Sequence, residues 1–245
     1  SYWVAESGAI TESQAAFDQV SMSPKTVGSM SDISRKMLLQ SSMDVESFVR
    51  NDLATSLALA IDSAAINGSG SSNQPTGVLN TSGIGSVVGG TNGAAPDWAD
   101  IVDLESAVAI DNADMGALGF LTNAATRGKL LQTEKASGTA QYVWSDSNTL
   151  RGYNAAVSNQ VPSNGTKGTG TALSSMGFGN WNDLIIGTWG GIDINVDTST
   201  GSASGTVRVV ALQDVDIAVR HAESFAAMTD IITYYQSLII ERHLL

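Results

Sequence analysis

The sequence predicts an α+β fold, because helix-like and strand-like patterns occupy separate stretches of the chain. A long helical stripe fills residues 42–66, and a second helical pattern opens at Pro96 and runs to about Ile110. Strand-like apolar runs gather later, at 183–189, 192–197 and 206–220. With 245 residues, the chain is long enough to bury a core as one large domain or two small ones.

The first forty residues predict an extended segment followed by a short helix. Residues 1–22 show patches of strand-like alternation around Phe17, Val20 and Met22, which is typical of an extended arm or half a hairpin. Residues 31–40 have the pattern of a short helix with Ser31 as its N-terminal cap.

Residues 42–66 give the clearest helical signal in the chain. Asp44 and Glu46 lie in the first turn, where the helix dipole favours acidic side chains. At 1.5 Å per residue, the helix would be a rod of roughly 37 Å. We expect Leu53 and Leu57 to be buried and Asp52, one position off the stripe, to be exposed. The stripe consists of Val45, Phe48, Val49, Leu53, Leu57, Ile61 and Ala65.

The stretch INGSGSSNQPTGVLN, residues 66–80, allows two interpretations. A phosphate-binding loop follows a strand and opens a helix, and its glycines have a fixed spacing. Here the glycines follow a helix, the G-x-G-x-x-G spacing fails, and no Gly-Lys-Ser/Thr comes after them. We therefore expect a helix exit, with Asn67 and Gly68 as the C-terminal cap and a turn through residues 74–77.

The remaining elements are shorter. A Gly-rich loop at 83–95 precedes the helix that opens at Pro96. The run GFLTN is typical of a buried strand, and its Asn123 can cap a helix over 124–132. Residues 137–164 mix strand and turn, 197–205 form a loop, 206–220 form one bent strand or two, and 237–245 form a strand or short helix.

Composition excludes several classes of function. Charged residues make up only 15% of the chain, which is low for a protein that must stay soluble alone. The 24 acidic and 12 basic residues give a net charge of -12, so there is no basic footprint for gripping DNA or an anionic membrane. Disulfides and thiolate metal sites are excluded because the sequence has no cysteine. No apolar run reaches the roughly 20 residues that span a bilayer.

The histidines and serines form no recognisable catalytic motif. His221 and His243 lie in neither an H-x-x-x-H nor an H-E-x-x-H setting, which argues against a zinc site. The sequence has no G-x-S-x-G nucleophile elbow. Its five tryptophans are spread along the chain, which indicates core or interface residues and not a sugar-binding platform.

Two groups of polar residues on predicted strands could carry chemistry. Asp193, Asn195 and Asp197 alternate on one face and could offer oxygens to calcium, although a solvated strand face is the plainer interpretation. Asp214 and Asp216 could form a pair of carboxylates, but acids at this spacing are more often simply exposed to solvent. We therefore predict no catalytic, cofactor-binding or metal site.

Four stretches in order carry a family resemblance. The most specific, residues 2–80, contains a Trp-x-x-Glu arm, a Ser-Arg helix start, a long helix with Asp62 and a Gly-x-Gly…Gln-Pro-x-Gly turn. Together the stretches resemble the major capsid proteins of tailed phages with the HK97 fold, although the segment after Ala226 matches poorly towards its end. The stretches are 2–80, 142–162, 184–197 and 210–226.

The resemblance implies an HK97-like capsid fold with an extended arm, a long spine helix, and peripheral and axial domains. The arm would lie over a neighbouring subunit. The implied parts are 1–22 as the returning half of the extended loop, 23–95 as the peripheral domain with its spine helix at 42–66, 96–205 as the axial domain, and 206–245 as the return to the peripheral domain with the C-terminal tail.

The resemblance also implies a structural shell subunit and not an enzyme. Copies would self-assemble into the pentamers and hexamers of an icosahedral capsid, which encloses double-stranded DNA without binding it specifically. Other implied partners are a portal, a scaffolding segment or protease, and a cement protein. Assembly would occur in the cytoplasm of the bacterial host, and the final location would be the virion capsid. The alternatives are an encapsulin-type nanocompartment shell and, in a different class, a secreted hydrolase with an unrecognised site.

Some members of the family that the chain resembles join subunits by an isopeptide bond. That bond needs a lysine on the extended loop, an asparagine on a neighbour and a glutamate as base. Residues 1–24 contain no lysine, and the first one is Lys25. The stretch TVRVVALQDV, where the family pattern places the asparagine and the glutamate, has neither, and its Gln213 cannot act as the base. We therefore expect a shell without covalent cross-links.

Overall fold

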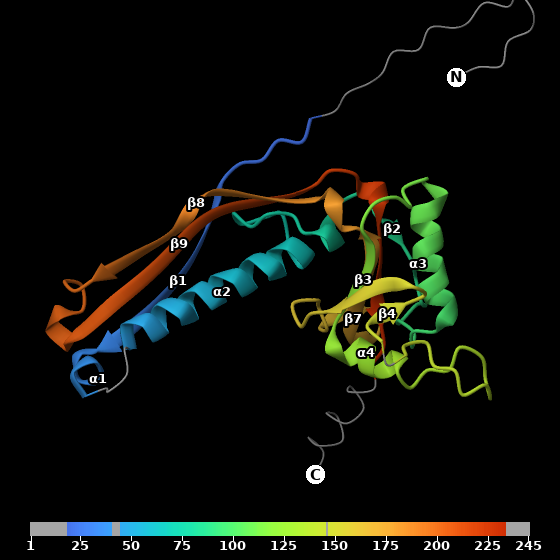
Figure 1. The fold of residues 1–245 in the computed structure, drawn as a ribbon, viewed down its shortest axis with the longest axis horizontal. Helices are drawn as coiled ribbons and strands as arrows, with labels where there is room; N and C mark the ends of the chain where they lie inside the picture. The colour runs from blue at the N-terminus through green and yellow to red at the C-terminus, as the bar shows by residue number, and fades with distance from the viewer. Residues whose placement is uncertain (1–18, 41–44, 146, 234–245) are drawn as a thin grey trace, which may run out of the picture.

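The protein consists of an elongated half and a compact half, and the predicted α+β class is confirmed (Figure 1). The computed structural model describes residues 19–40, 45–145 and 147–233, so most of the predicted arm at 1–22 and the element predicted at 237–245 lie outside the described residues. The elongated half contains β1 (Lys25–Ser34), α1 (Arg35–Gln40), α2 (Val45–Asn67), β8 (Leu184–Asp197) and β9 (Thr206–Val219).

The elongated half is built on a three-stranded antiparallel sheet in the order β1-β9-β8. The stretch predicted as one bent strand or two is the single strand β9. The two strands predicted at 183–189 and 192–197 are one strand, β8, whose register shifts between Trp189 and Asp193. Gly190 within this bulge has φ +78°, a backbone conformation that residues with a Cβ rarely adopt.

Helix α2 covers one face of this sheet, as Figure 1 shows. Leu53 and Leu57 are buried and Asp52 is exposed, so the predicted phase of the helix is confirmed. Phe48 departs from the predicted stripe, because it is 62% exposed. The buried cluster between helix and sheet consists of Ile33, Val49, Leu53, Leu57, Val209 and Ala211, with Val27 and Ile194 packed against it.

The prediction of a helix over 31–40 with Ser31 as its cap is wrong in its first four residues. Strand β1 continues to Ser34, because Ile33 pairs with Val207 in the ladder and buries its side chain under α2. Helix α1 starts only at Arg35. Its cap is Ser34, whose hydroxyl accepts a hydrogen bond from the backbone N–H of Met37 at 3.3 Å.

The compact half surrounds a seven-stranded mixed sheet in the order β2-β10-β7-β3-β5-β4, with β6 paired to β7. The pairs β3–β5 and β10–β2 are parallel, and the others are antiparallel. The elements are β2 (Gly85–Ser86), α3 (Trp98–Ile110), β3 (Leu118–Thr122), α4 (Ala124–Leu130), β4 (Thr149–Leu150), β5 (Tyr153–Val157), β6 (Gly165–Lys167), β7 (Gly170–Asn180) and β10 (Phe225–Ile231).

Helix α4 begins where the sequence predicted, whereas α3 begins at Trp98, two residues after the predicted Pro96. Asp97 caps α3 in a capping box, in which Asp97 and Asp100 each accept the other's backbone N–H at 3.0 Å. Asn123 caps α4, since its side-chain oxygen accepts the N–H of Thr126 at 2.8 Å. The strand predicted in GFLTN is β3.

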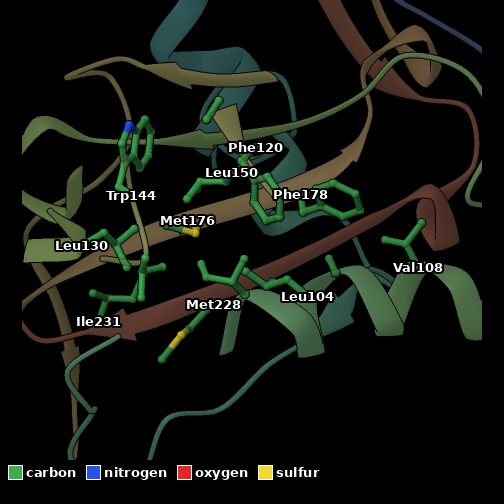
Figure 2. Packing of buried hydrophobic residues seen from close by; sticks show 14 residues of the cluster. Leu104, Val108, Phe120, Leu130, Trp144, Leu150, Met176, Phe178, Met228 and Ile231 are labelled. Carbon is green, nitrogen blue, oxygen red and sulfur yellow. The ribbon is translucent and has the colours of Figure 1, made fainter. Parts of the chain in front are cut away.

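The core of the compact half lies between α3 and the sheet (Figure 2). Phe120 on β3 and Phe178 on β7 are both buried, and their ring centroids are 4.4 Å apart. Leu104 and Val108 reach this cluster from α3, and Trp144 lies at the other side of it, as Figure 2 shows. The compact half therefore has a hydrophobic core of its own, separate from the one under α2.

The two halves meet at a junction formed by residues 180–184 and 220–224, where the chain passes between β7 and β8 and between β9 and β10. Asp183, which is buried, accepts hydrogen bonds from the Asn180 side chain at 2.9 Å and the Ser224 hydroxyl at 2.8 Å. Its carboxylate also lies 2.8 Å from the Arg220 guanidinium, and its carbonyl accepts the Arg220 N–H at 2.8 Å. The Asp183 side chain thus links these two connections, and a third connection between the halves runs from α2 to β2.

The two sheets draw on interleaved parts of the chain. Strand β8 lies within residues 96–205 but pairs with β9 in the elongated half, and β10 lies within residues 206–245 but pairs with β7 in the compact half. None of the helices among the described residues has the length and apolar character needed to cross a bilayer.

Substitutions on α2 test the packing of this helix. Leu53→Ala or Leu57→Ala should lower the free energy of unfolding by about 2–5 kcal/mol, because each leaves a cavity against the sheet. Asp52→Ala should change it by no more than about 0.5 kcal/mol, because Asp52 is exposed. Urea unfolding followed by circular dichroism measures all three. Equal losses at positions 52 and 53 would contradict the packing described here.

Candidate functional site

Of the two histidines in the sequence, the structure describes His221. His221 lies within the junction and lines a hollow of about 410 Å³ together with Asp111, Met115 and Glu223. The buried acid in this hollow, Asp183, is already engaged by the junction contacts. His243 lies outside the described residues.

The polar stripe on β8 is used for a turn. Asp197 accepts hydrogen bonds from the N–H and hydroxyl of Ser199, at 2.8 and 2.7 Å, and from the N–H and hydroxyl of Thr200. These bonds hold the pKa of Asp197 well below its usual range. Asp193 and Asn195 are exposed, as the solvated-face interpretation predicted. Nowhere in the described part of the chain do three His, Cys, Asp or Glu side chains gather in a way that could hold a metal ion.

The two acids on β9 have separate partners, and the prediction that both are simply exposed is wrong for Asp216. Asp214 accepts a hydrogen bond from the Thr26 hydroxyl at 2.6 Å. Asp216 is only 5% exposed and forms an ion pair with Lys25 at 2.8 Å. Burial alone would raise the pKa of Asp216, but its bonds to Lys25, Ser23 and Ile217 lower the pKa overall. No local pattern announces this pairing, because Lys25 is about 190 residues away.

The glycine- and serine-rich stretch after α2 is a helix exit, as predicted. It forms a small hairpin in which Ser69 faces Thr76, and its tight turn is at Ser72 and Asn73, which both have positive φ. The sequence analysis placed the turn at residues 74–77, so the observed turn lies two residues earlier than predicted. Gly68 is needed for space and not for a left-handed cap, since a Cβ there would lie 2.2 Å from the Pro75 carbonyl oxygen.

The backbone N–H groups of this hairpin are directed inward. Those of Gly68, Gly70, Gln74 and Gly77 donate to backbone carbonyls within residues 64–75, and that of Ser69 donates to the Gln74 side chain. A loop that binds phosphate must leave such donors free for the anion. The hairpin therefore has the geometry of a structural exit.

Asp230 on β10 holds together three segments of the compact half. This carboxylate is 2% exposed and accepts hydrogen bonds from the Lys167 ammonium on β6 at 2.6 Å. It also accepts the N–H groups of Gly89 at 3.1 Å and Gly90 at 3.4 Å. Burial by itself would raise the pKa of Asp230, but these bonds lower it overall. Sequence analysis missed this residue, since its partners are distant along the chain.

The face of the three-stranded sheet opposite α2 carries exposed apolar side chains. Because side chains alternate along a strand and Val27, Ile33, Val209 and Ala211 face α2, the intervening residues face away from it. Met30, 65% exposed, pairs with Val210 on this open face. The side chain of Leu212, 41% exposed, lies against the backbone at Gly28, where an added Cβ would be 2.8 Å from the Leu212 Cδ2.

Polar groups surround the apolar centre of this open face. At one end Arg208 forms a bidentate pair with Asp32, at 2.7 and 2.9 Å. Trp189 of β8 pairs with Asp214 towards the other end and is itself partly exposed. An apolar patch within a polar rim is the usual arrangement of a protein–protein interface. Sequence analysis could not find it, because it depends on which face α2 covers.

Comparison with known sequences gives a consistent result. The model of the phage capsid family matches residues 1–230. The major capsid protein of Halomonas phage phiHAP-1 is 33% identical over 225 residues, which are 92% of this chain and 35% of that protein. The major capsid protein of Klebsiella oxytoca phage phiKO2 is 26% identical over 243 residues, covering 90% of this chain and 55% of that protein. The chain thus spans about a third and about half of the length of these two relatives.

Comparison with solved structures concerns the fold. The capsid of a native GTA particle superposes with a TM-score of 0.73 at 23% identity, covering 95% of this chain and 81% of that one. A structure described as Mycobacterium phage Ogopogo gives 0.70 at 18% identity, covering 93% and 82%. The SrpI encapsulin complex of Synechococcus elongatus gives 0.60 at 14% identity, covering 85% and 74%. The predicted HK97-like fold is confirmed by these neighbours.

Acid should weaken the compact half through Asp230. Its folded pKa is lowered below the unfolded value of about 3.9, so its contribution to stability is complete above about pH 4 and is lost as the pH falls through the folded pKa. Asp230→Asn should lower the free energy of unfolding by about 1–3 kcal/mol at neutral pH, because an amide cannot accept all these donors. It should also flatten the loss of stability in acid.

Urea unfolding at a series of pH values measures this effect. Asp114→Asn, which changes an exposed carboxylate in the same half, is the matched control and should leave both the stability and its pH dependence close to those of the unaltered protein. If Asp230→Asn keeps the full acid sensitivity of the unaltered protein, the role given to Asp230 is wrong.

Proposed function

The chain belongs to the phage capsid family, and from this premise we propose that it is a shell subunit that assembles with copies of itself into a phage capsid. The units of the shell are pentamers and hexamers, and the finished icosahedral shell encloses double-stranded DNA. The curated relatives are major capsid proteins, which are structural proteins and not enzymes.

The open face of the elongated sheet is the observation that supports this proposal best. Met30, Val210 and Leu212 form an apolar strip that α2 does not cover. Such a strip on a long, thin half of a molecule gains stability when a second chain covers it. We assign it to contacts between subunits, with the predicted arm of a neighbouring copy, residues 1–22, as the segment that lies over it.

The two halves of the molecule correspond to the two domains expected of the fold. In this proposal the peripheral domain is the half with α2 as its spine helix, and the axial domain is the compact half. Strand β8 then belongs with the peripheral domain although it lies within residues 96–205. Strand β10 belongs with the axial domain although it lies within residues 206–245.

The proposed surroundings of the shell follow from this role. The subunit encloses DNA without gripping it, which suits a chain with a net charge of -12. Its other partners are a portal, a scaffolding segment or protease, and a cement protein. Assembly takes place in the cytoplasm of the bacterial host, and the mature protein resides in the virion capsid.

An encapsulin-type compartment is the second candidate, because an encapsulin shares the fold at a TM-score of 0.60. The sequence matches favour the phage capsid, since both curated relatives are phage major capsid proteins. Family membership leaves no support for the secreted hydrolase. The content of purified particles separates the two shells, because a capsid contains nucleic acid and an encapsulin contains protein cargo.

Assembly should depend on the open face. Full-length protein should form shells visible by negative-stain microscopy, and Met30→Ser with Leu212→Ser should leave it as monomers or small oligomers in light scattering. The thermal stability of the subunit should stay nearly unchanged, because both side chains are exposed. Met115→Ser, a comparably exposed methionine of the compact half, is the control. Full assembly of the double variant would show that the open face is not the interface.

The shell should contain no covalent links between subunits. A lysine attacks only after it loses its proton, and the Nζ of Lys25 is already engaged in an ion pair with Asp216 at 2.8 Å. Particles boiled in SDS with reductant should therefore give a single band at the subunit mass. A ladder of oligomers that survives this treatment would contradict the prediction.

A further inference from the structure

The ladder between β1 and β9 ends at a proline. The last pair is Lys25 with Val215, so the next position would place Pro24 opposite Asp216. Proline has no N–H to donate to a ladder, which is why strands end beside it. Strand β9 itself continues to Val219, paired with Leu184 on its other side. The chain before β1 therefore leaves the sheet while the sheet goes on, as Figure 1 shows for residues 19–24.

Where the β1–β9 ladder ends, the Asp216 side chain holds the chain to the sheet in place of backbone pairing. Its carboxylate accepts the backbone N–H of Ser23 and the ammonium of Lys25, each at 2.8 Å, so it holds the residues on both sides of Pro24. Its third bond, from the N–H of Ile217 at 2.9 Å, fixes the carboxylate to its own strand. A carboxylate can accept all three donors at once, whereas a neutral amide offers a single acceptor oxygen.

The segment then crosses the sheet towards β8. Gly187 pairs with Asp216 across the β8–β9 ladder, and the side chain of Met22 lies over Gly187. A Cβ at Gly187 would lie 3.0 Å from the Met22 Cε, and the Trp189 ring lies within 3.6 Å of the same point. The path from β1 over Asp216 to Gly187 is thus transverse to the strands, and glycine provides the room for it.

We propose that Asp216 is a positioning residue, which turns residues 19–24 across the sheet and so sets the direction in which the preceding arm leaves the subunit. Asp216, Lys25 and Gly187 form a seat, meaning the group of residues on which residues 19–24 rest. This seat is present in the isolated subunit. Its consequence for assembly rests on the proposed function, in which the arm lies over a neighbour. A subunit whose arm leaves in another direction cannot reach that neighbour's open face.

The seat can be tested in unassembled full-length protein by hydrogen exchange of residues 19–24. Asp216→Asn should speed exchange of the Ser23 amide about five- to tenfold, because the amide group cannot serve both Ser23 and Lys25. Asp214→Asn is the matched control, since Asp214 lies two residues away on the same face and, among the described residues, accepts a hydrogen bond from Thr26 and not from Ser23 or Lys25. It should leave exchange in residues 19–24 unchanged.

Lys25→Met provides a second variant in case Asp216→Asn fails to fold, because Lys25 is partly exposed and methionine keeps most of its apolar stem. It should also speed exchange at Ser23, and it should add little to the effect of Asp216→Asn in the double variant. Unchanged exchange in both variants, or an equal change in Asp214→Asn, would overturn the proposal.

Particle yield separates this inference from the proposed function. If the unaltered protein assembles, Asp216→Asn and Lys25→Met should lower the yield of closed shells, while Asp114→Asn, which changes an exposed carboxylate of the compact half, should not. If the unaltered protein fails to assemble, the proposed function is wrong, but the exchange at Ser23 still decides whether Asp216 holds the segment. Full yield from variants whose exchange is faster would show that the direction of the arm has no role in assembly.

Discussion

The ladders on both sides of β9 are the constraint on which the elongated half depends. β9 is paired with β1 along one edge and with β8 along the other, so its register determines the face of every side chain in the sheet. Val209 and Ala211 meet α2, and Val210 and Leu212 are left on the open face. The same strand leads into the junction at Arg220. A slip of one residue would exchange the covered and the open faces together.

The acidic composition serves two different purposes. Asp183, Asp216 and Asp230 are buried, and each joins segments that lie far apart in the sequence through ion pairs and hydrogen bonds. Such groups stabilise a fold only while their partners stay in place. Asp230 fixes the loop at residues 89–90, Asp216 fixes the segment before β1, and Asp183 fixes the junction. The net charge of -12 also suits a shell that encloses DNA without gripping it, as in the proposed function.

Local patterns in the sequence predicted most of the helices, but they could not predict the pairing between segments that are distant along the chain. The phase of α2, the end of α3 at Ile110 and the cap at Asn123 follow from residues within one or two turns. The predicted cap at Ser31 is wrong because strand pairing with β9 extends to Ser34, and Phe48 is exposed because the buried line of α2 runs through its neighbour Val49 and through Leu53. The open face and the partner of Asp216 depend on register between segments nearly 190 residues apart, which no local pattern contains.

In the proposed shell, the length of α2 would let the elongated half act as a lever, with the junction around Asp183 taken as its pivot. The helix has 23 residues and a length of about 35 Å, so a rotation of about 5° at the pivot moves its far end by about 3 Å, close to one residue along a strand. Pentamers and hexamers need slightly different angles between neighbours. In such a shell, the contacts of one buried aspartate would affect the curvature of the whole particle, because they set how easily the angle between the elongated and the compact half can change.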